Sequence, residues 1–468
     1  MEKLQTTINE ALTVSGVGLH TGQKVNMTFK PAEVDHGYKF QRVDLEEQPI
    51  VDALVDYVID VSRGTTLEQN GARIYTVEHV LAALVGLEID NVLIQLDAAE
   101  TPIMDGSSKP FVELLKKVGI KQQTKEREYF VVPHNISYAE EDRGVEMVAM
   151  PLDDYRLTVM IDYNSPVLGS QHASITSISE FDQEISSCRT FCFLHELEML
   201  VDNNLIKGGD LNNAIVIVDR VIKDDELESL AKLFNKPKVE VKKEGILNNV
   251  ELRFQNEPAR HKLLDMIGDL ALIGMPLKAQ IMAARPGHAA NVAFAKKIRK
   301  IMLKTRKEVQ RTMNIPKYDP NLEPVFNYQQ IEKILPHTFP FLLVDKIIQI
   351  NETSILAVKN ITGDQYFFQG HFQGEPLMPG VLQLEAMAQA GGVLVLHDKE
   401  NPAAWSTYFV KIESAKFKGK VVPGDSLLIK MELTAPIRRG LCLMHGEAYV
   451  GDRLVSEANM MAQIVENK

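Results

Sequence analysis

One helical segment of the sequence carries residues that could hold a metal ion. In NEPARHKLLDMIGDLALIG (256–274), His261 and Asp265 are four positions apart and Asp269 is four further, so all three project along one side of a helix. An imidazole and a carboxylate on one helical face form half of a catalytic zinc site, which takes three protein ligands and leaves a position for water. The pair is also typical of a hydrogen bond on a helix surface, so this segment alone leaves both interpretations open.

Two further segments hold side chains suited to hydrolysis. Glu78 and His79 lie in the first turn of a helix that Thr76 should cap, and His288 stands beside a glycine at the start of another amphipathic helix. A metal-assisted hydrolase needs histidine and carboxylate ligands, a general base and a second acid. Taken singly, each side chain also fits a structural role, as a helix-capping carboxylate, a hydrogen-bonded core histidine or a helix-start cap. Only their combination points to hydrolysis.

A different pair of titratable side chains lies in the last third of the chain. A glycine-rich loop containing His371 leads into a helix that is apolar almost all round, from Val381 to Leu396, yet contains Glu385. Burying a carboxylate there costs several kcal/mol unless the group is hydrogen-bonded or protonated, and a nearby amide such as Gln389 is the structural explanation. Paired with a histidine in a dry pocket, the same carboxyl group suits removal of a proton beside a carbonyl and loss of a hydroxyl.

The elements that must position these residues form two halves joined by a proline-rich spacer. In NIPKYDPNLEPVF (314–326), Pro316, Pro320 and Pro324 come at four-residue intervals, and neither a helix nor a central strand can run through them. Strand and helix patterns mix before the spacer, and a charged break near 125–128 divides them. After the spacer, strand patterns follow one buried helix, and a sheet wrapped around such a helix is the hotdog arrangement.

The sequence thus predicts an α+β protein with several domains. We expect two domains in the first half, at 1–126 and 127–313, then a linker at 314–325 and a hotdog domain at 326–468. Within the second domain, residues 220–249 are highly charged, and there we expect a solvated excursion.

Composition excludes several classes of protein. The 468 residues carry a net charge of −12, which argues against bulk binding of nucleic acid or of an anionic membrane. Cys188, Cys192 and Cys442 are too few and too scattered for a disulfide framework or a zinc finger, so we expect thiols in a reducing cytosol. The N-terminus lacks an apolar signal core, and no run of about 18 apolar residues could span a membrane. We therefore expect a cytoplasmic protein with no transmembrane segment.

Seven motifs of the first half occur together in one known family. They are, in order, GVGLHTG, TVEHVLAAL, PIMDGSS, CRTF, GGDLNNAIV, RHKLLDMIGDL and PGHAANVAFA, within residues 1–313. This half resembles the UDP-3-O-acyl-N-acetylglucosamine deacetylases, the zinc enzymes that commit precursors to lipid A in Gram-negative bacteria. The resemblance implies two similar α/β layers packed face to face, and a UDP-sugar lipid as the substrate.

The resemblance also implies a catalytic zinc centre. His79, His261 and Asp265 would bind Zn²⁺ and leave one site for water and the substrate carbonyl, while Glu78 would be the general base that deprotonates this water. The family joins the AIVIVD strand to the zinc helix by a much shorter connection than this chain has. Residues 220–249 therefore either decorate the fold or contact the second enzyme.

The remaining site residues also come from the resemblance. His288, held by Asp269, would carry a positive charge, and its protonated ring would protonate the leaving amine. Thr190 would donate a hydrogen bond to the oxyanion, Phe191 would line the site, and Lys262 would meet the diphosphate of the nucleotide.

The second half carries motifs of another family. At the start of its buried helix, the N–H of Gly380 is a natural group to polarise a thioester oxygen. LPHTFPFLLVDKI and GHFQGEPLMPGVLQLEAMAQ, in the region from Phe326 to the C-terminus, are similar to the 3-hydroxyacyl-acyl-carrier-protein dehydratases.

That family implies His371 as the base that takes the C2 proton and Glu385, from the neighbouring subunit, as the group that assists departure of the hydroxyl. It also implies a homo-oligomer, a dimer at least and a trimer of dimers as the expected assembly. Gln373 stands where the family commonly has proline, a difference that concerns the rigidity of the loop.

Together the two resemblances predict a bifunctional enzyme, a zinc deacetylase fused to a dehydratase. Two alternatives remain: the hotdog half is only a dimerising or acyl-binding module, or the first half is an inert scaffold. Acyl carrier protein, an acidic partner, would dock on a basic rim unless that rim is merely solvated. The rim consists of Lys416, Lys418, Lys420, Arg438 and Arg439. The spacer would set stoichiometry and assembly, because the deacetylase does not use the product of the dehydratase.

Overall fold

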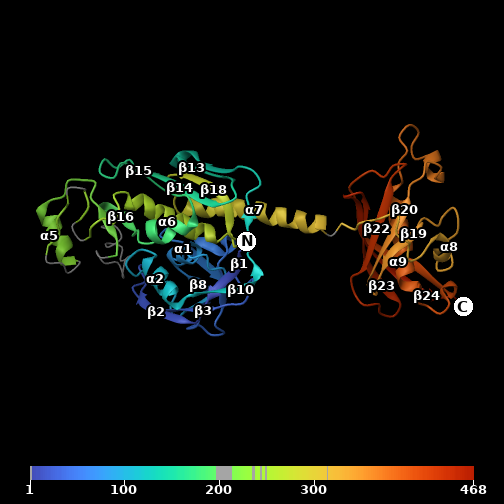
Figure 1. The fold of residues 1–468 in the computed structure, drawn as a ribbon, viewed down its shortest axis with the longest axis horizontal. Helices are drawn as coiled ribbons and strands as arrows, with labels where there is room; N and C mark the ends of the chain where they lie inside the picture. Colours follow the sequence, from blue (N-terminus) through green and yellow to red (C-terminus); the bar gives the residue numbers. More distant parts are fainter. Residues whose placement is uncertain are drawn as a thin grey trace. The chain divides into compact units, whose positions relative to one another are not determined.

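The chain folds into two compact units. The computed structural model describes residues 3–196, 213–233, 238–242, 245–247, 250–313 and 315–467. Unit 1 comprises residues 1–304 and unit 2 residues 305–468 (Figure 1). Both contain helices and sheets, so the predicted α+β class is confirmed. No described helix combines the length and the apolar character needed to cross a membrane.

Unit 1 begins with a five-stranded sheet. The order of its strands is β2 (Leu12–Val17), β3 (Lys24–Pro31), β9 (Val92–Leu96), β4 (Tyr38–Arg42) and β5 (Ile50–Asp52). The β9–β4 pair is parallel and the other pairs are antiparallel. Burial alternates along β3, where Val25, Met27 and Phe29 are buried, as expected for a strand with one face toward a core.

A second sheet in unit 1 repeats this topology. The path of its strands is β12 (Ile136–Glu140), β13 (Val145–Pro151), β18 (Leu277–Ala284), β14 (Tyr155–Asp162) and β15 (Ser170–Ile175), with β11 (Phe130–Val131) paired beside β18. Here too the third and fourth strands of the path are parallel, and the pairs on either side of them are antiparallel. The prediction of two similar α/β layers is confirmed.

Helices fill the space between the two sheets. Figure 1 shows α1 (Glu78–Gly86) and α6 (Glu257–Ala271) side by side, and the two helices pack against each other. A Cβ atom on Gly268 would lie 2.0 Å from the backbone oxygen of Glu78, so only glycine permits this approach. The contact brings the first turn of α1 against the middle of α6.

Shorter elements complete unit 1. They are β1 (Leu4–Ile8) paired with β10 (Ile120–Glu126), the sheet of β6 (Val58–Asp60), β7 (Thr66–Gln69) and β8 (Ala72–Ile74), the pair β16 (Phe191–Phe193) and β17 (Ile215–Ile217), and helices α2 (Lys109–Val118), α3 (Phe181–Glu184) and α5 (Asp224–Leu233). The long helix α7 (His288–Met313) begins in unit 1, and its residues after 304 belong to unit 2. Three 3-10 turns, Val55–Tyr57, Glu141–Arg143 and Ile178–Glu180, connect them.

The described residues of the charged insertion 220–249 combine exposed charged side chains with a small apolar cluster. Among its described residues, Leu230, Val239 and Leu247 are buried in one cluster with Val216 of β17. The apolar side chains are spaced between the charges, so the charges can face water while the apolar groups pack. The solvated excursion expected from the composition stays a prediction, and the structure adds to it a packed apolar cluster.

Unit 2 is one antiparallel sheet around one helix. The strand order is β19 (Lys346–Ile350), β20 (Ser354–Asn360), β22 (Ser426–Leu433), β23 (Leu441–Val450), β24 (Arg453–Glu466) and β21 (Trp405–Phe417). Helix α9 (Gly380–Leu396) packs on this sheet and is buried along most of its length, which confirms the predicted hotdog arrangement. Its smaller elements are α8 (Tyr328–Ile331) and the 3-10 turns Tyr366–Gln369 and Pro402–Ala404.

Part of the predicted spacer belongs to unit 2. Ile315 and Tyr318 pack against a small apolar cluster formed by Val358, Leu428 and Tyr449 on the sheet. The first residue of the spacer, at position 314, lies outside the described residues. The described part of the spacer is therefore attached to the sheet at its beginning.

Candidate active sites

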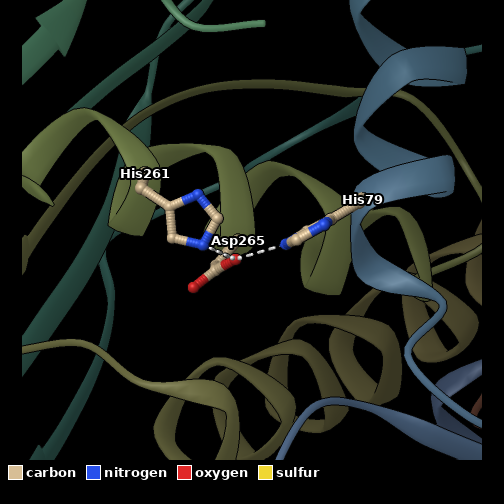
Figure 2. A group of neighbouring side chains, drawn as sticks. All are labelled: His79, His261 and Asp265. Atoms are coloured by element: carbon tan, nitrogen blue, oxygen red, sulfur yellow. Dashed lines mark ion pairs between the residues drawn. The ribbon is translucent and has the colours of Figure 1, made fainter. Parts of the chain in front are cut away.

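Helices α1 and α6 bring together the three residues of a potential metal centre. The ligand atoms of His79, His261 and Asp265 lie within 4.8 Å of one another, and all three side chains are buried (Figure 2). Asp265 Oδ1 is 3.2 Å from His261 Nε2 and 3.6 Å from His79 Nε2, and both imidazoles point toward it. The i,i+4 spacing on α6 and the close contact of the two helices produce this arrangement.

The chemistry of these donors fits a divalent cation such as zinc. Asp265 Oδ1 is buried and has no hydrogen-bond donor among the described residues. His261 Nδ1 must donate to the carbonyl oxygen of Cys188 at 3.0 Å, which leaves the lone pair on Nε2, the atom that faces Asp265. Burial lowers the pKa of His261 to about 3, so the imidazole is neutral, as a metal ligand must be.

Glu78 lies beside the potential metal centre and is fully enclosed. Its Oε2 accepts a hydrogen bond from the backbone N–H of Thr65 at 2.9 Å, and burial raises the pKa of its carboxyl group. A Cβ atom on Gly64 would lie 2.8 Å from Glu78 Oε1, so glycine, with φ of +144°, leaves room for the carboxylate. A buried carboxylate with a raised pKa suits general-base chemistry.

His288 faces Glu78 across the same site. Its Nδ1 is 2.9 Å from Asp269 Oδ2, and its Nε2 is 4.0 Å from Glu78 Oε1 and 3.8 Å from Asp265 Oδ2. Burial lowers the pKa of His288, but Asp269 and Asp265 outweigh that effect and raise it to about 9. His288 therefore carries a positive charge at neutral pH, with its Nε2–H directed into the site.

Phe191 and Lys262 lie beside the potential metal centre, and Thr190 precedes Phe191 in the chain. The Phe191 ring is 6.4 Å from the His261 ring, and Lys262 Nζ is 5.5 Å from the centre of Phe191. Lys262 Nζ also contacts Asp265 Oδ2 at 2.8 Å. The backbone of Thr190 is fixed by its N–H donating to the oxygen of Gly106 at 2.8 Å and by its own oxygen accepting from the N–H of Ile215.

Three supporting residues were not predicted from the sequence. The hydroxyl of Thr65 donates to Asp269, and the amide of Asn291 donates to the other oxygen of Asp269 at 2.8 Å. Arg189 forms a buried ion pair with Glu257 at 2.9 Å, which ties the segment before Thr190 to the start of α6. Asn291 could have been found, because it follows His288 by one helical turn. The contacts of Thr65 with Asp269 and of Arg189 with Glu257 join segments that are distant in the sequence, so only the tertiary fold reveals them.

The predicted residues of the second half do not meet within one chain. Glu385 projects from α9, where its Oε1 accepts a hydrogen bond from Gln389 Nε2 at 2.9 Å, the local amide contact that the sequence suggested. It lines a cavity of about 250 Å³ together with the apolar side chains of Met444 and Met460. His371 donates from Nδ1 to the oxygen of Leu377 at 2.8 Å, and in the described chain it forms no ion pair with Glu385.

Gly380 begins α9, as its place in the sequence predicted. A Cβ atom on Gly380 would lie 2.7 Å from the Phe417 ring, so the start of the helix packs closely against β21. The first N–H groups of a helix have no partner inside the helix, which makes this end suited to polarising an oxygen.

Comparison with known proteins gives two families, in the order that the motifs predict. The UDP-3-O-acyl N-acetylglycosamine deacetylase family matches residues 5–234 and 231–300, and the FabA-like domain matches residues 335–459. A deacetylase of that name from Myxococcus xanthus is 38% identical over 295 residues, which are 63% of this chain and 86% of the relative.

Proteins that contain both parts align along the whole chain. The bifunctional enzyme LpxC/FabZ of Bacteroides thetaiotaomicron is 46% identical over 465 residues, which are 99% of each protein. The protein of the same name from Chlorobaculum tepidum is 46% identical over 468 residues, again 99% of each. The predicted combination of a deacetylase with a dehydratase is confirmed, and the chain belongs to the family of bifunctional LpxC/FabZ enzymes.

Proposed function

We propose that unit 1 hydrolyses the N-acetyl group of UDP-3-O-(3-hydroxyacyl)-N-acetylglucosamine and that unit 2 dehydrates (3R)-3-hydroxyacyl-acyl carrier protein to the trans-2-enoyl thioester. The observation that carries this proposal is the buried group of His79, His261 and Asp265 with Glu78 and His288 beside it, inside the region that matches the deacetylase family. The second activity rests on Glu385 and His371 within the FabA-like region.

In the deacetylase reaction, His79, His261 and Asp265 would hold Zn²⁺. When bound, such an ion polarises the amide carbonyl and lowers the pKa of water. Glu78 accepts the proton of the attacking water, and a carboxyl group whose pKa is raised by burial can then pass that proton on. The C–N bond breaks, acetate forms, and the amine nitrogen takes a proton from His288 Nε2–H.

The positions of Glu78 and His288 support this division of roles. Glu78 Oε1 and His288 Nε2 are 4.0 Å apart, so one bound amide group can lie within reach of both, with the attacking water near Glu78 and the leaving nitrogen near His288. Asp269 contacts Nδ1 of His288, which directs the other N–H of the ring toward the substrate.

Three residues beside the potential metal centre are assigned to substrate contacts. We assign Thr190 to the oxyanion, Phe191 to the wall of the site and Lys262 to the diphosphate. Because Lys262 Nζ already contacts Asp265 Oδ2 at 2.8 Å, it would have to share its charge between Asp265 and a phosphate. Its contact with the Phe191 ring holds it on the outer side of that carboxylate.

In the dehydratase reaction, two copies of the chain would share each site. His371 takes the C2 proton, the C3–O bond breaks, and the proton of Glu385 leaves with the hydroxyl as water, so that an alkene remains. Gly380 N–H would polarise the thioester oxygen while negative charge develops on it.

The edge of the unit 2 sheet supports a dimer. Strand β21 is the outermost strand, and Tyr408, Phe409, Val410 and Ile412 are exposed along it. An exposed apolar edge strand requires a covering partner, and the β21 strand of a second copy supplies a matching edge. We propose a dimer on this basis, and a trimer of dimers as the full assembly.

Fewer residues of the proposed docking rim are available to acyl carrier protein than the sequence suggests. Lys416 and Lys418 form ion pairs with Glu457, at 3.1 and 2.6 Å, and Lys420 pairs with Glu375. Paired lysines attract an acidic partner less strongly. The remaining members, Arg438 and Arg439, are exposed, and we assign the docking contact mainly to them. We also propose a cytoplasmic location, which the substrates of both reactions favour.

Mass spectrometry of both reactions tests the proposed function. The purified chain should release acetate from the UDP-sugar lipid and water from the 3-hydroxyacyl thioester. His261→Ala should abolish only the first reaction, and His371→Ala only the second. If dehydration is absent from the unmodified chain, the hotdog unit is an acyl-binding or dimerising module instead. Dehydration that survives His371→Ala would refute the assignment of His371 as the base. If deacetylation is absent or survives His261→Ala, the metal site is not its catalyst.

A further inference from the structure

Glu385 has a histidine neighbour in its own chain that the proposed mechanism does not use. His337 Nε2 lies 3.5 Å from Glu385 Oε1. His337 belongs to the loop that follows α8, so its distance from Glu385 along the chain is large and only the fold brings the two together. Both residues line the same cavity of about 250 Å³. His337 is therefore part of the wall around the proposed reacting atoms.

The loop that carries His337 is bound to α9 by the same amide that contacts Glu385. Gln389 Nε2 donates to the oxygen of Phe341 at 2.8 Å and to Glu385 Oε1 at 2.9 Å, and Gln389 Oε1 accepts from the N–H of Leu343 at 2.7 Å. The His337 ring lies against the Phe341 ring with 6.0 Å between centres and 30° between planes. These contacts fix the ring of His337 at the carboxylate.

The surroundings of the imidazole indicate which nitrogen carries the proton. His337 Nδ1 is buried and has no hydrogen-bond partner among the described residues, whereas Nε2 faces a carboxylate oxygen. A neutral imidazole has one N–H, and it is most stable where an acceptor is present. The proton is therefore assigned to Nε2, the ring nitrogen that lies 3.5 Å from Glu385 Oε1.

We infer that His337 is a positioning residue for Glu385 in dehydration, an inference that rests on the proposed function of unit 2. His337 and Gln389 both act on Oε1, so Oε2 is assigned to the 3-hydroxyl. When the C3–O bond breaks, the proton of Glu385 leaves with the hydroxyl as water, and Glu385 becomes a carboxylate. Hydrogen bonds to a charged acceptor are stronger than those to a neutral one, so the N–H of His337 stabilises the carboxylate more than the acid and lowers the barrier.

A pair of amide substitutions separates this role from a structural one. The amide nitrogen of glutamine can take the place of His337 Nε2, whereas that of asparagine corresponds to Nδ1 and falls short of Glu385. In the full chain, His337→Gln should keep kcat of dehydration within about threefold of the unmodified protein. His337→Asn should lower kcat about 10- to 100-fold, because it removes one hydrogen bond to a charged group. KM should change little.

His397 supplies the matched control. It lies beyond the other end of α9, donates from Nδ1 to the oxygen of Leu394 at 3.0 Å and contacts the Phe326 ring at 6.0 Å between centres. His397→Asn should leave dehydration within about twofold. Deacetylation by the same samples should not change in any variant, which checks the folding of unit 1 and the protein concentration.

The outcomes distinguish the inference from the function on which it rests. Equal activity of His337→Asn and His337→Gln, whether both are high or both are low, would overturn the inference. Failure of the unmodified chain to dehydrate would refute the proposed function instead. If His337→Asn melts well below the unmodified protein, His337→Phe replaces it, because phenylalanine keeps the ring contact with Phe341 and removes only the donor. The same loss of kcat is then expected, and its absence overturns the inference.

Discussion

The two proposed active sites of this chain differ in how many of their residues meet within one copy. In unit 1, His79, His261 and Asp265 meet inside a single fold, with all ligand atoms within 4.8 Å. In unit 2, the neighbours of Glu385 within the chain are Gln389 and His337. His371 instead donates a hydrogen bond to the backbone oxygen of Leu377.

The difference follows from how each fold closes its core. Unit 1 has two sheets of the same topology, so its two central helices are covered on both sides by one chain. Unit 2 has one sheet, one buried helix and an exposed apolar edge at β21. A duplicated layer supplies internally what, in the proposed dimer, a single layer would take from a second copy. The deacetylase site should therefore be independent of association, whereas the dehydratase site should depend on it.

The largest effect is expected inside the self-contained site. Glu78→Ala removes the proposed base but none of the three metal donors, so it should lower deacetylation about 10²- to 10⁴-fold while zinc remains bound. Activity and metal content are measured on the same sample. Loss of zinc in this variant would contradict the assignment of Glu78 as base. Glu78→Gln is the control for volume, and it should be equally inactive because an amide cannot accept the proton.

Complementation between inactive variants tests the comparison directly. His371→Ala and Glu385→Ala should each abolish dehydration, but a mixed dimer of the two has one site in which both residues are intact. Random mixing should therefore restore about a quarter of the unmodified activity. Glu78→Ala mixed with His288→Ala should restore no deacetylation, because both residues come from one unit. Failure of the first mixture would place the dehydratase site within one chain.

The sequence predicted the parts of each site that depend on local spacing. His261, Asp265 and Asp269 follow one face of α6 by the helical period, and Glu385 stands out as a carboxyl group in an apolar helix. The two sheets could also be anticipated from strand patterns and from the family motifs.

What the sequence could not predict depends on contacts across the fold. The Cys188 carbonyl that orients His261 and the Thr65 hydroxyl on Asp269 come from distant segments, and no spacing rule connects them. His337 has the same character, because its loop reaches Glu385 only after α9 has packed. The apolar cluster in the insertion 220–249 was also not predicted, because the high charge of the segment drew attention away from the spacing of its apolar residues.

The pH dependence of deacetylation should show the charge of His288. Burial lowers the pKa of His288, but Asp269 and Asp265 raise it to about 9, so the acid form is present below that pH and is lost as pH rises. A cation on Asp265 would offset part of that attraction. The rate should therefore fall on an alkaline limb with a midpoint at or below about 9, and approach tenfold per pH unit beyond it. His288→Gln should be slow and should lack this limb, whereas an unchanged limb would assign it to another group.

The smallest effect is expected when the two units are separated. Tyr318 packs on the sheet of unit 2, whereas Asn321 and Leu322 are exposed, so a protease site between them can be cut without opening either core. Both rates should stay within about twofold, because neither site contains a described residue of the other unit and neither reaction uses the product of the other. Tyr318→Ala is the control for loss of the packed segment. A large loss of deacetylation after cutting would show that unit 1 depends on the assembly held by unit 2, and the contrast between a self-contained and a shared site would fail.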